Sequence, residues 1–464
     1  MSTYVPRGAR PTMLVVELEG APQVAAAAES LGWRPIFVST DRYADWLPAP
    51  DRAWAEAHAD SVVSESEPSF HRLFGLAESL GAGSVLPISL LEPECCRDAL
   101  LRDHAERARS TMRVIANRPS VVELTYDKWL TKTVLAEADF PVVPGRIVSS
   151  GEALLRAADE LGAPLVCKPR RDFTGRGVRV LATRADVEAF ARKGTVRDLL
   201  VEPFTPGAEV SVEIIRSGGT CHVQPVAYKG ETRLNAVEHP IYRPRVAPWR
   251  PGSAVTRRLT SLAISIATEL RLEGAAELEF IVAGDQPYLM EINPRVSGVT
   301  RMAMAAGGRD TFGLLARMAA GFSIADVSAP APSVAIGLPI TVPTTDPRVV
   351  AAARAPSVRY VKPITWMPLL PIKGSVLLAA ESTDALLDEV QRFAPLTSDA
   401  YLLQAYTALE ATRGVEQVVP RAVAVEAAYE TAYAPRPVSP ALLPAMLSAM
   451  LGGPSHGRGA EAVA

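Results

Sequence analysis

Three oxygen-bearing side chains within residues 275 to 298 have the types and the spacing of a site for a hard cation. Glu279 and Glu291 are 12 residues apart, and Asn293 follows two residues later. The letters "GDQ" around Asp285 separate two apolar runs and predict a hairpin turn. In a hairpin centred on Asp285, the two glutamates lie opposite each other and Asn293 shares their face, because side chains alternate along a strand. Such oxygen ligands suit magnesium ions that also bind nucleotide phosphates.

Charge repulsion favours this interpretation. Two facing carboxylates repel each other and lose hydration, which disfavours the pairing unless a cation lies between them. The alternative is an edge strand with a solvated polar face. The apolar neighbours instead indicate a sheet with one buried face and one functional face; they are Leu278, Phe280, Ile292 and Val296.

Positive charges and backbone donors for phosphates lie upstream. Lys168 ends the apolar strand "PLVCK", where a lysine is rarely buried without a reason. The loop "RRDFTGRGV" follows, and its N–H groups and guanidinium groups can fold over phosphates. Its candidate contacts are Thr174, Gly175, Arg176 and Gly177. Lys128, near the start of the predicted helix "TYDKWLTKTVLAEADF", is a further candidate. The alternatives are an ordinary surface hairpin for the loop and a solvated side chain for Lys128.

The segment "LLVEPFTPGAEVSVEII" reads as two strands joined by a turn, and it offers contacts for a nucleoside. Phe204 provides an apolar wall for a base, and the amide of Thr205 provides a donor. Glu202 and Glu209 flank the turn, and Glu209 can accept hydrogen bonds from ribose hydroxyls. A plain hairpin with two exposed glutamates is the alternative.

Composition restricts the class of protein. The chain has 464 residues, of which 48% are hydrophobic and 21% are charged, as in globular proteins with a sizeable core. The net charge of -3 gives no reason to expect nucleic acid or an acidic membrane as a partner. No secretory signal and no apolar run of about 20 residues is visible. Four cysteines without metal-ligand spacing favour reduced thiols. We therefore expect a cytoplasmic protein that acts on small molecules.

Together these motifs resemble the ATP-grasp superfamily over roughly residues 115 to 320. The resemblance rests on "VEPFTPGAEVSVE" and "MEINPRVSG", in order after Lys128 and Lys168. It implies that both lysines contact ATP phosphates. It also implies that Glu202 and the Thr205 backbone contact adenine, and that Glu209 contacts ribose.

The same resemblance implies roles for the hairpin. Glu279, Glu291 and Asn293 would hold two Mg²⁺ ions, with Mn²⁺ as a possible substitute. Arg295 would be the catalytic residue, with its guanidinium on the transferring phosphoryl group and the acyl intermediate. The reaction implied is carboxylate activation, in which a carboxylate attacks the γ-phosphorus of ATP and an amine then displaces phosphate from the acyl phosphate. Such chemistry needs positioning and charge neutralisation rather than a covalent residue.

Within the superfamily, the sequence is most similar to L-amino-acid ligases and other amide-forming enzymes of natural-product pathways. That group implies a substrate contact by Glu238 and His239 in "NAVEHPIYRPRVAP". Ser297 and Gly298 offer backbone amides to a substrate carboxylate, which favours an amino acid. A biotin-carboxylase-like enzyme and a non-catalytic ATP-binding regulatory module stay open as alternatives. A homodimer through the N-terminal domain is also compatible with the resemblance.

The expected architecture is an α/β ATP-grasp fold with flanking domains. Strand and helix signals alternate over residues 12 to 120 and predict a parallel sheet covered on both faces. The first strand lacks a following G-x-G-x-x-G, which argues against a dinucleotide site. We expect an N-terminal α/β domain at 1–115, an ATP-grasp domain at 116–325 with a lid subdomain at about 142–205, a C-terminal α+β subdomain at 326–445 and a disordered tail at 446–464.

Overall fold

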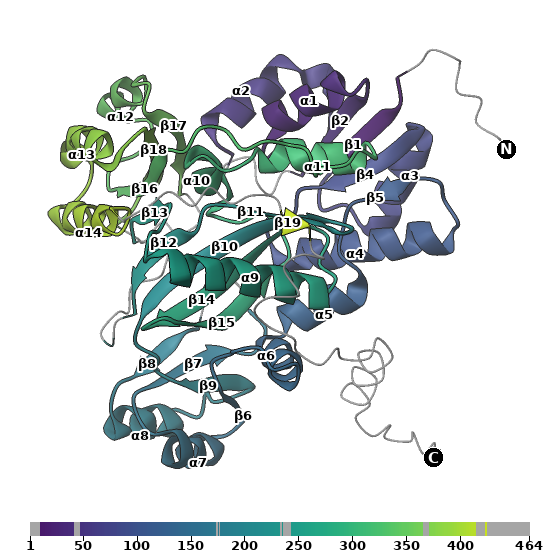
Figure 1. Cartoon of the computed structure of the whole chain (residues 1–464). Helices are drawn as coiled ribbons and strands as arrows, with labels where there is room; N and C mark the ends of the chain where they lie inside the picture. The colour runs from purple at the N-terminus through teal and green to yellow at the C-terminus, as the bar shows by residue number, and fades with distance from the viewer. Residues whose placement is uncertain are drawn as a thin grey trace, which may run out of the picture.

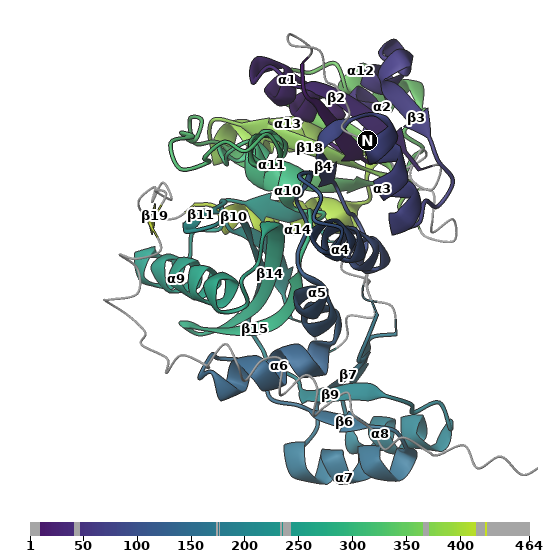
Figure 2. The same cartoon turned by 90° about the vertical axis from the view of Figure 1, so that its right-hand side faces the viewer.

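The computed structural model describes residues 10–40, 47–172, 175, 177–232, 234, 243–364, 371–413 and 423–424. Within them the chain forms three sheets, and Figures 1 and 2 show the sheet nearest the N-terminus at one end of the molecule and a small sheet at the other. The first sheet is parallel and the other two are antiparallel. This arrangement confirms the expected α/β class.

The N-terminal sheet has the strand order β3-β2-β1-β4-β5. Its central strand β1 is buried at every residue, which explains the unbroken apolar run in the sequence. Helix α11, from much later in the chain, packs on α1 and shares a core with β1. The close approach requires a glycine, because a Cβ on Gly20 would lie 2.3 Å from the ring of Phe312. The elements are β1 (Thr12–Val16), α1 (Ala21–Ser30), β2 (Arg34–Ser39), α2 (Ala49–Ala57), η2 (Ala59–Ser61), β3 (Val62–Ser64), α3 (Phe70–Ser79), β4 (Ala82–Pro87), α4 (Glu92–Arg107), β5 (Arg113–Val114) and α11 (Thr311–Ala319).

The second sheet carries the predicted hairpin. Strand β14 pairs with β10 on one side and with β15 on the other, and α9 covers the apolar face of the hairpin (Figure 1). The opposite face of the hairpin therefore carries its polar side chains. These elements are β10 (Ala208–Ser217), β11 (Thr220–Val223), β12 (Ala227–Glu231), β13 (Arg245–Ala247), α9 (Ser253–Glu269), β14 (Gly274–Ala283), β15 (Gln286–Asn293) and α10 (Thr300–Ala305).

The same sheet continues into the C-terminal part of the chain. Strand β13 pairs with β16, which pairs with β18. The sheet thus crosses the expected domain boundary at 325. The further elements are β16 (Val334–Ile340), α12 (Pro347–Ala352), β17 (Val358–Pro363), β18 (Gly374–Ala380), α13 (Thr383–Arg392), η4 (Ala394–Leu396), α14 (Asp399–Glu410) and β19 (Val423–Ala424). The expected tail at 446–464 lies outside the described residues.

The third sheet has the order β6-β9-β7-β8 and stands apart with two helices at the lower end of both views. It occupies the region expected for the lid. Its elements are β6 (Arg146–Val148), α7 (Gly151–Leu161), β7 (Leu165–Pro169), β8 (Arg179–Leu181), α8 (Arg184–Arg192) and β9 (Leu199–Pro203). Strand β9 leads directly into β10, so the residues between them connect the lid to the second sheet.

One expected helix is divided. The sequence predicts a continuous helix over 125–140, but α5 (Pro119–Tyr126) ends before Asp127 and α6 (Lys128–Glu137) begins after it. Asp127 has extended backbone angles, and its side chain accepts a hydrogen bond from the amide of Leu130. An aspartate that caps a helix in this way favours a new start over continuation of the previous helix. Among the helices that the structure describes, none is long and apolar enough to cross a membrane.

Candidate active site

The two glutamates face each other across the hairpin, as expected. Glu279 pairs with Glu291, and Glu277 pairs with Asn293. The Asn293 amide donates to Glu277 and to Glu279, at 3.2 Å in each case. The side chains of Glu279 and Glu291 are 20% and 25% exposed. The prediction that these side chains share one face is therefore confirmed, although the amide nitrogen of Asn293, and not its oxygen, is directed at the glutamates.

Each carboxylate of the facing pair contacts a buried lysine. Lys229 on β12 lies 2.7 Å from Glu279, and Lys128 at the start of α6 lies 3.1 Å from Glu291. The ammonium of Lys128 also donates to the carbonyl of Asp172, in the loop after β7. Two cations thus offset two carboxylates that would otherwise repel each other.

The pKa values of the two glutamates move in opposite directions. Burial acts to raise the pKa of Glu279, but Lys229 and Arg245 outweigh burial and lower it. Burial raises the pKa of Glu291, and repulsion by Glu279 adds to this effect while Lys128 opposes it. The negative charge of Glu291 is therefore less well stabilised than that of Glu279, and a nearby divalent cation would stabilise it.

A second cluster joins the lid to α6. The ammonium of Lys168, at the end of β7, lies 2.7 Å from Glu202 on β9, and that of Lys132 lies 2.5 Å from the other oxygen of the same carboxylate. All three residues are at most 8% exposed. Burial acts to lower the pKa of Lys168, but Glu202, Glu291 and Glu279 outweigh burial and raise it. The last two contributions link this cluster to the hairpin carboxylates.

Lys132 gives a stability test of the cluster. Burial and the like charge of Lys168 lower its pKa from 10.5 to about 8, against the attraction of Glu202. Between about pH 8 and 10.5, the unfolded chain therefore binds more protons at this lysine than the folded chain, so folding stability from this group rises with pH. We expect Lys132→Met to remove this increase in the free energy of unfolding, which is about 3 kcal/mol for the full shift in pKa.

Urea unfolding at pH 7.5 and 10 measures the difference between the wild type and Lys132→Met. The exposed Lys193 provides the control variant Lys193→Met, which should keep the wild-type pH dependence. An identical pH dependence for wild type and Lys132→Met would contradict the lowered pKa of Lys132 in this cluster.

The predicted nucleoside contacts lie where the lid meets the second sheet. Phe204 and Thr205 follow β9 and are partly buried, and the amide of Phe204 donates to the carbonyl of Pro164. Glu209, in β10, pairs with Arg243 at 3.1 Å. Glu202 points its carboxylate at the two lysines rather than into solvent. The structure thus places these four residues at the junction between β9 and β10. It also shows that Glu202 pairs with Lys132 and Lys168, which the sequence did not indicate.

The phosphate loop is described in part. Gly175 and Gly177 have φ angles of 72° and 73°, which glycine adopts without strain. Thr174 and Arg176 lie outside the described residues, as do Glu238 and His239.

Arg295 and the turn after it adjoin the hairpin. The guanidinium of Arg295 donates to Glu92 and to the side-chain oxygen of Asn293. The amide of Ser297 donates to Thr300. Gly298 is exposed, and a Cβ there would lie 3.0 Å from the guanidinium of Arg245. The amide of Ser297 is thus already paired within the turn, whereas Gly298 lies beside a further cation.

The donor set fits magnesium, although its protein ligands are few. In the part of the chain that the structure describes, no three His, Cys, Asp or Glu side chains are grouped closely enough to hold a metal ion. The predicted ligands in the hairpin are two carboxylates and one amide, whose oxygen accepts a hydrogen bond from Arg295. Mg²⁺ is commonly bound through one or two carboxylates together with phosphate oxygens and water, rather than by a cage made only of protein. The residues present therefore fit a cation that arrives with a phosphate ligand.

Sequence reasoning missed two lysines of this site. Lys132 lies one helical turn after Lys128, and this spacing places both on one face of a helix. Lys229 follows Ala227 and Tyr228 in β12 and is buried with them, so the argument that drew attention to Lys168 applies to it as well. Both signals were present in the sequence.

Comparison with known proteins identifies the class of domain. The family model of the ATP-grasp domain matches residues 125–299. These residues contain Lys128, the loop after Lys168, the junction between β9 and β10, and the hairpin. The chain carries an ATP-grasp domain, and the resemblance drawn from its motifs is confirmed.

Individual relatives are more distant. The carbamoyl-phosphate synthase of Methanobrevibacter smithii is 28% identical over 255 residues, which is 54% of this chain and 68% of that protein. The chain spans only 18% and 23% of two carbamoyl phosphate synthase large chains that it also matches, from Geobacillus stearothermophilus and Streptomyces coelicolor.

Two solved structures share the fold. One is the L-amino acid ligase from Bacillus licheniformis, with a TM-score of 0.63, 17% identity and coverage of 83% of this chain and 98% of that one. The other is the biotin carboxylase domain of the Hydrogenobacter thermophilus 2-oxoglutarate carboxylase, in complex with MgADP, ADP and bicarbonate. It has a TM-score of 0.60, 19% identity and coverage of 82% and 89%.

Proposed function

We propose that this chain is an ATP-dependent carboxylate–amine ligase, which forms an amide or peptide bond through an acyl phosphate and takes an amino acid as a substrate. The observation that carries the proposal is the facing pair Glu279–Glu291, with a buried lysine on each carboxylate. The two ion pairs are not expected to add much stability to the fold, because removing charged groups from water is costly. It is useful where phosphates and a divalent cation bind together.

The residues divide the work as follows. Lys128 and Lys168 bind the phosphates of ATP, and they release their carboxylate partners to do so. Glu279, Glu291 and Asn293 would hold two Mg²⁺ ions, or Mn²⁺ in their place, and such ions would supply positive charge near the transferring phosphoryl group. Arg295 stabilises the phosphoryl group and the acyl intermediate.

The nucleoside and the substrate occupy the two sides of this centre. Phe204, the Thr205 amide and Glu202 receive adenine, and Glu209 receives ribose. The turn at Ser297 and Gly298, beside Arg245, receives the carboxylate. Glu238 and His239, which lie outside the described residues, would contact the substrates.

ADP release with a panel of substrates tests this function. The purified chain, Mg²⁺ and ATP are incubated with pooled amino acids, with bicarbonate alone, and with neither. A ligase releases ADP and forms an amide product by mass spectrometry only when both a carboxylate and an amine are present. Stimulation by bicarbonate alone would favour the biotin-carboxylase-like reaction. Nucleotide binding without ADP release under any condition would favour a regulatory module.

The phosphate loop gives a prediction about water exclusion. We expect Gly175→Pro combined with Gly177→Pro to lower amide product more than ADP release, because proline cannot adopt a positive φ and removes two N–H donors. An open loop exposes the acyl phosphate to hydrolysis. The ratio of ADP to product should rise roughly tenfold, which corresponds to about 1.4 kcal/mol of lost discrimination.

Product and ADP are measured in the same reaction. Gly194→Pro is the matched control, because Gly194 also has a positive φ of 67° but lies outside the loop. Limited proteolysis at residues 170–177 should also slow when an ATP analogue and Mg²⁺ are added. An equal loss of product and ADP, with cleavage insensitive to nucleotide, would show that the loop is an ordinary surface hairpin.

A further inference from the structure

The guanidinium of Arg295 is held from the N-terminal domain. Its Nη2 and Nε donate to one oxygen of Glu92, at 2.6 Å and 3.2 Å. Its other contacts come from its own strand and turn, namely Asn293 and the carbonyl of Val296. Glu92 is therefore the contact that fixes the guanidinium from outside the ATP-grasp domain.

Among the described residues, Glu92 does not cap its own helix. It is the first residue of α4, where a carboxylate commonly caps the helix. That task is performed by Glu94, whose carboxylate accepts from the amides of Leu90 and Leu91. The second carboxylate oxygen of Glu92 is buried and has no hydrogen-bond partner in the described part of the chain.

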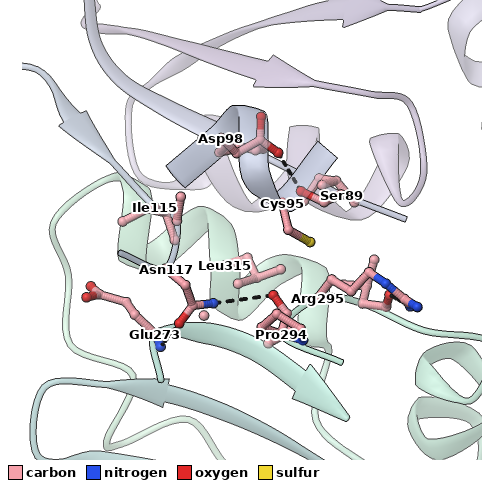
Figure 3. Close-up of a pocket in the computed structure, with 15 residues that line it drawn as sticks. Ser89, Cys95, Asp98, Ile115, Asn117, Glu273, Pro294, Arg295 and Leu315 are labelled. Carbon is pink, nitrogen blue, oxygen red and sulfur yellow. Dashed lines mark hydrogen bonds between the residues drawn. The ribbon is translucent and has the colours of Figure 1, made fainter. Parts of the chain in front are cut away.

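Arg295 also lines a cavity at the boundary with the N-terminal domain. The cavity has a volume of about 40 Å³ and lies between that domain and the end of the hairpin. Figure 3 shows Cys95, Leu315 and Asn117 around this space, with the guanidinium of Arg295 directed away from the Cys95 sulfur. The amide of Asn117 donates to the carbonyl of Pro294 and so holds the backbone before Arg295. The backbone is tied by Asn117, and the side chain is tied by Glu92.

The burial of this ion pair is not explained by stability. The side chains of Arg295 and Glu92 are 10% and 6% exposed, and desolvation of two charges commonly cancels their attraction. What the pair provides is a fixed direction for the guanidinium, and a misplaced group near the reacting atoms loses much of its effect.

We infer that Glu92 is a positioning residue for Arg295, through which the N-terminal domain orients the guanidinium at the catalytic centre. The inference rests on the proposed function for the role of Arg295, and it adds a residue outside the ATP-grasp domain to that function. It predicts that Glu92 acts on the rate only through Arg295.

A double-mutant cycle in turnover tests this dependence. Glu92→Gln keeps the size of the side chain and removes its charge, and it should lower kcat for ADP release with Mg²⁺, ATP and pooled amino acids by roughly 10- to 100-fold. The KM for ATP should stay within about twofold, because Glu92 contacts neither the phosphate-binding lysines nor the residues assigned to adenine and ribose. In an Arg295→Lys background, the same substitution should cause no further loss.

The control is Glu106→Gln on the same helix, which breaks surface ion pairs with Arg102 and Arg118 and should leave kcat unchanged. Losses that multiply in the double variant, or a wild-type kcat for Glu92→Gln, would overturn the inference while leaving the ligase proposal intact.

A wild-type chain without turnover would overturn the proposed function instead. In that case the melting temperatures of Glu92→Gln, Arg295→Lys and the double variant still decide the pairing. Additive shifts would show that Glu92 does not act on the guanidinium, and the inference would fall. A double variant no less stable than the worse single variant would retain the pairing, as the inference requires.

Discussion

Glu291→Gln is expected to reduce ATP turnover by at least about 100-fold, the scale of losing electrostatic stabilisation worth roughly 3 kcal/mol. The substitution keeps the shape of the side chain and removes one of the two facing charges. It leaves Glu279 with Lys229 and leaves Lys128 without its carboxylate. ADP release under saturating ATP, with the Mg²⁺ concentration varied, measures the effect. Added Mg²⁺ should recover little of the lost rate.

Two opposing effects act on the stability of the same variant. Burial raises the pKa of Glu291 in the folded state. A raised pKa means that its contribution to stability is present below the unfolded pKa and is lost as the pH rises through the folded pKa. An amide removes the buried carboxylate, but it also leaves the buried ammonium of Lys128 without its carboxylate partner. We therefore expect the variant to stay folded, with a change in stability that is small beside its loss of turnover.

Asp285→Asn provides the matched control. Asp285 is exposed at the turn of the same hairpin, so this variant removes one carboxylate from the hairpin without touching the facing pair. It should keep wild-type turnover and the wild-type melting temperature. Wild-type turnover in a folded Glu291→Gln protein would contradict the proposal that the hairpin holds the metal ions.

In the hairpin, the sequence predicted the correct pairing of the two glutamates but not the correct centre of the turn. A turn centred on Asp285 predicts that Glu279 faces Glu291, and it does. The observed turn is centred half a residue earlier, because Ala283 pairs with Gln286. Between Glu279 and Phe280 the pairing shifts by one residue, because Met290 on the other strand has no partner. This bulge is the reason that Glu279 still faces Glu291. Bulges depend on how neighbouring strands twist, so local sequence does not specify them.

The partners of the charged residues were harder to predict than the residues themselves. Spacing and strand position identified Glu202 and Lys168, but not that these two pair with each other across β9 and β7. The contact of Glu92 with Arg295 joins residues 203 positions apart. Such contacts follow from how whole domains pack, and no motif in a single chain records them. The α/β class followed from local periodicity, which needs no such knowledge.

Lys168→Ala should weaken ATP binding by roughly 10- to 100-fold, because hydrogen bonds to charged groups contribute about 1.5–3 kcal/mol. An isolated buried lysine would be expected to cost stability, so that its removal would raise the melting temperature. The structure reverses this expectation, since Lys168 is paired with Glu202 at 2.7 Å and Glu202 is itself buried. Breaking a buried pair leaves the remaining charge poorly compensated. We therefore expect the melting temperature to fall.

Lys132 limits the fall in the melting temperature of Lys168→Ala. It also changes how the stability of this variant depends on pH. It stays on the other oxygen of Glu202, so the carboxylate keeps one cation. The like charge of Lys168 is one of the causes that lower the pKa of Lys132. Without Lys168 this pKa should rise, and the pH window in which stability increases should move above its wild-type start near pH 8. Urea unfolding across pH 7.5 to 10.5 measures the window, and titration with an ATP analogue and Mg²⁺ measures the affinity. If the folded fraction of Lys168→Ala binds nucleotide as tightly as the wild type while its stability falls, Lys168 serves only to neutralise Glu202, and the phosphates must be held by other cations.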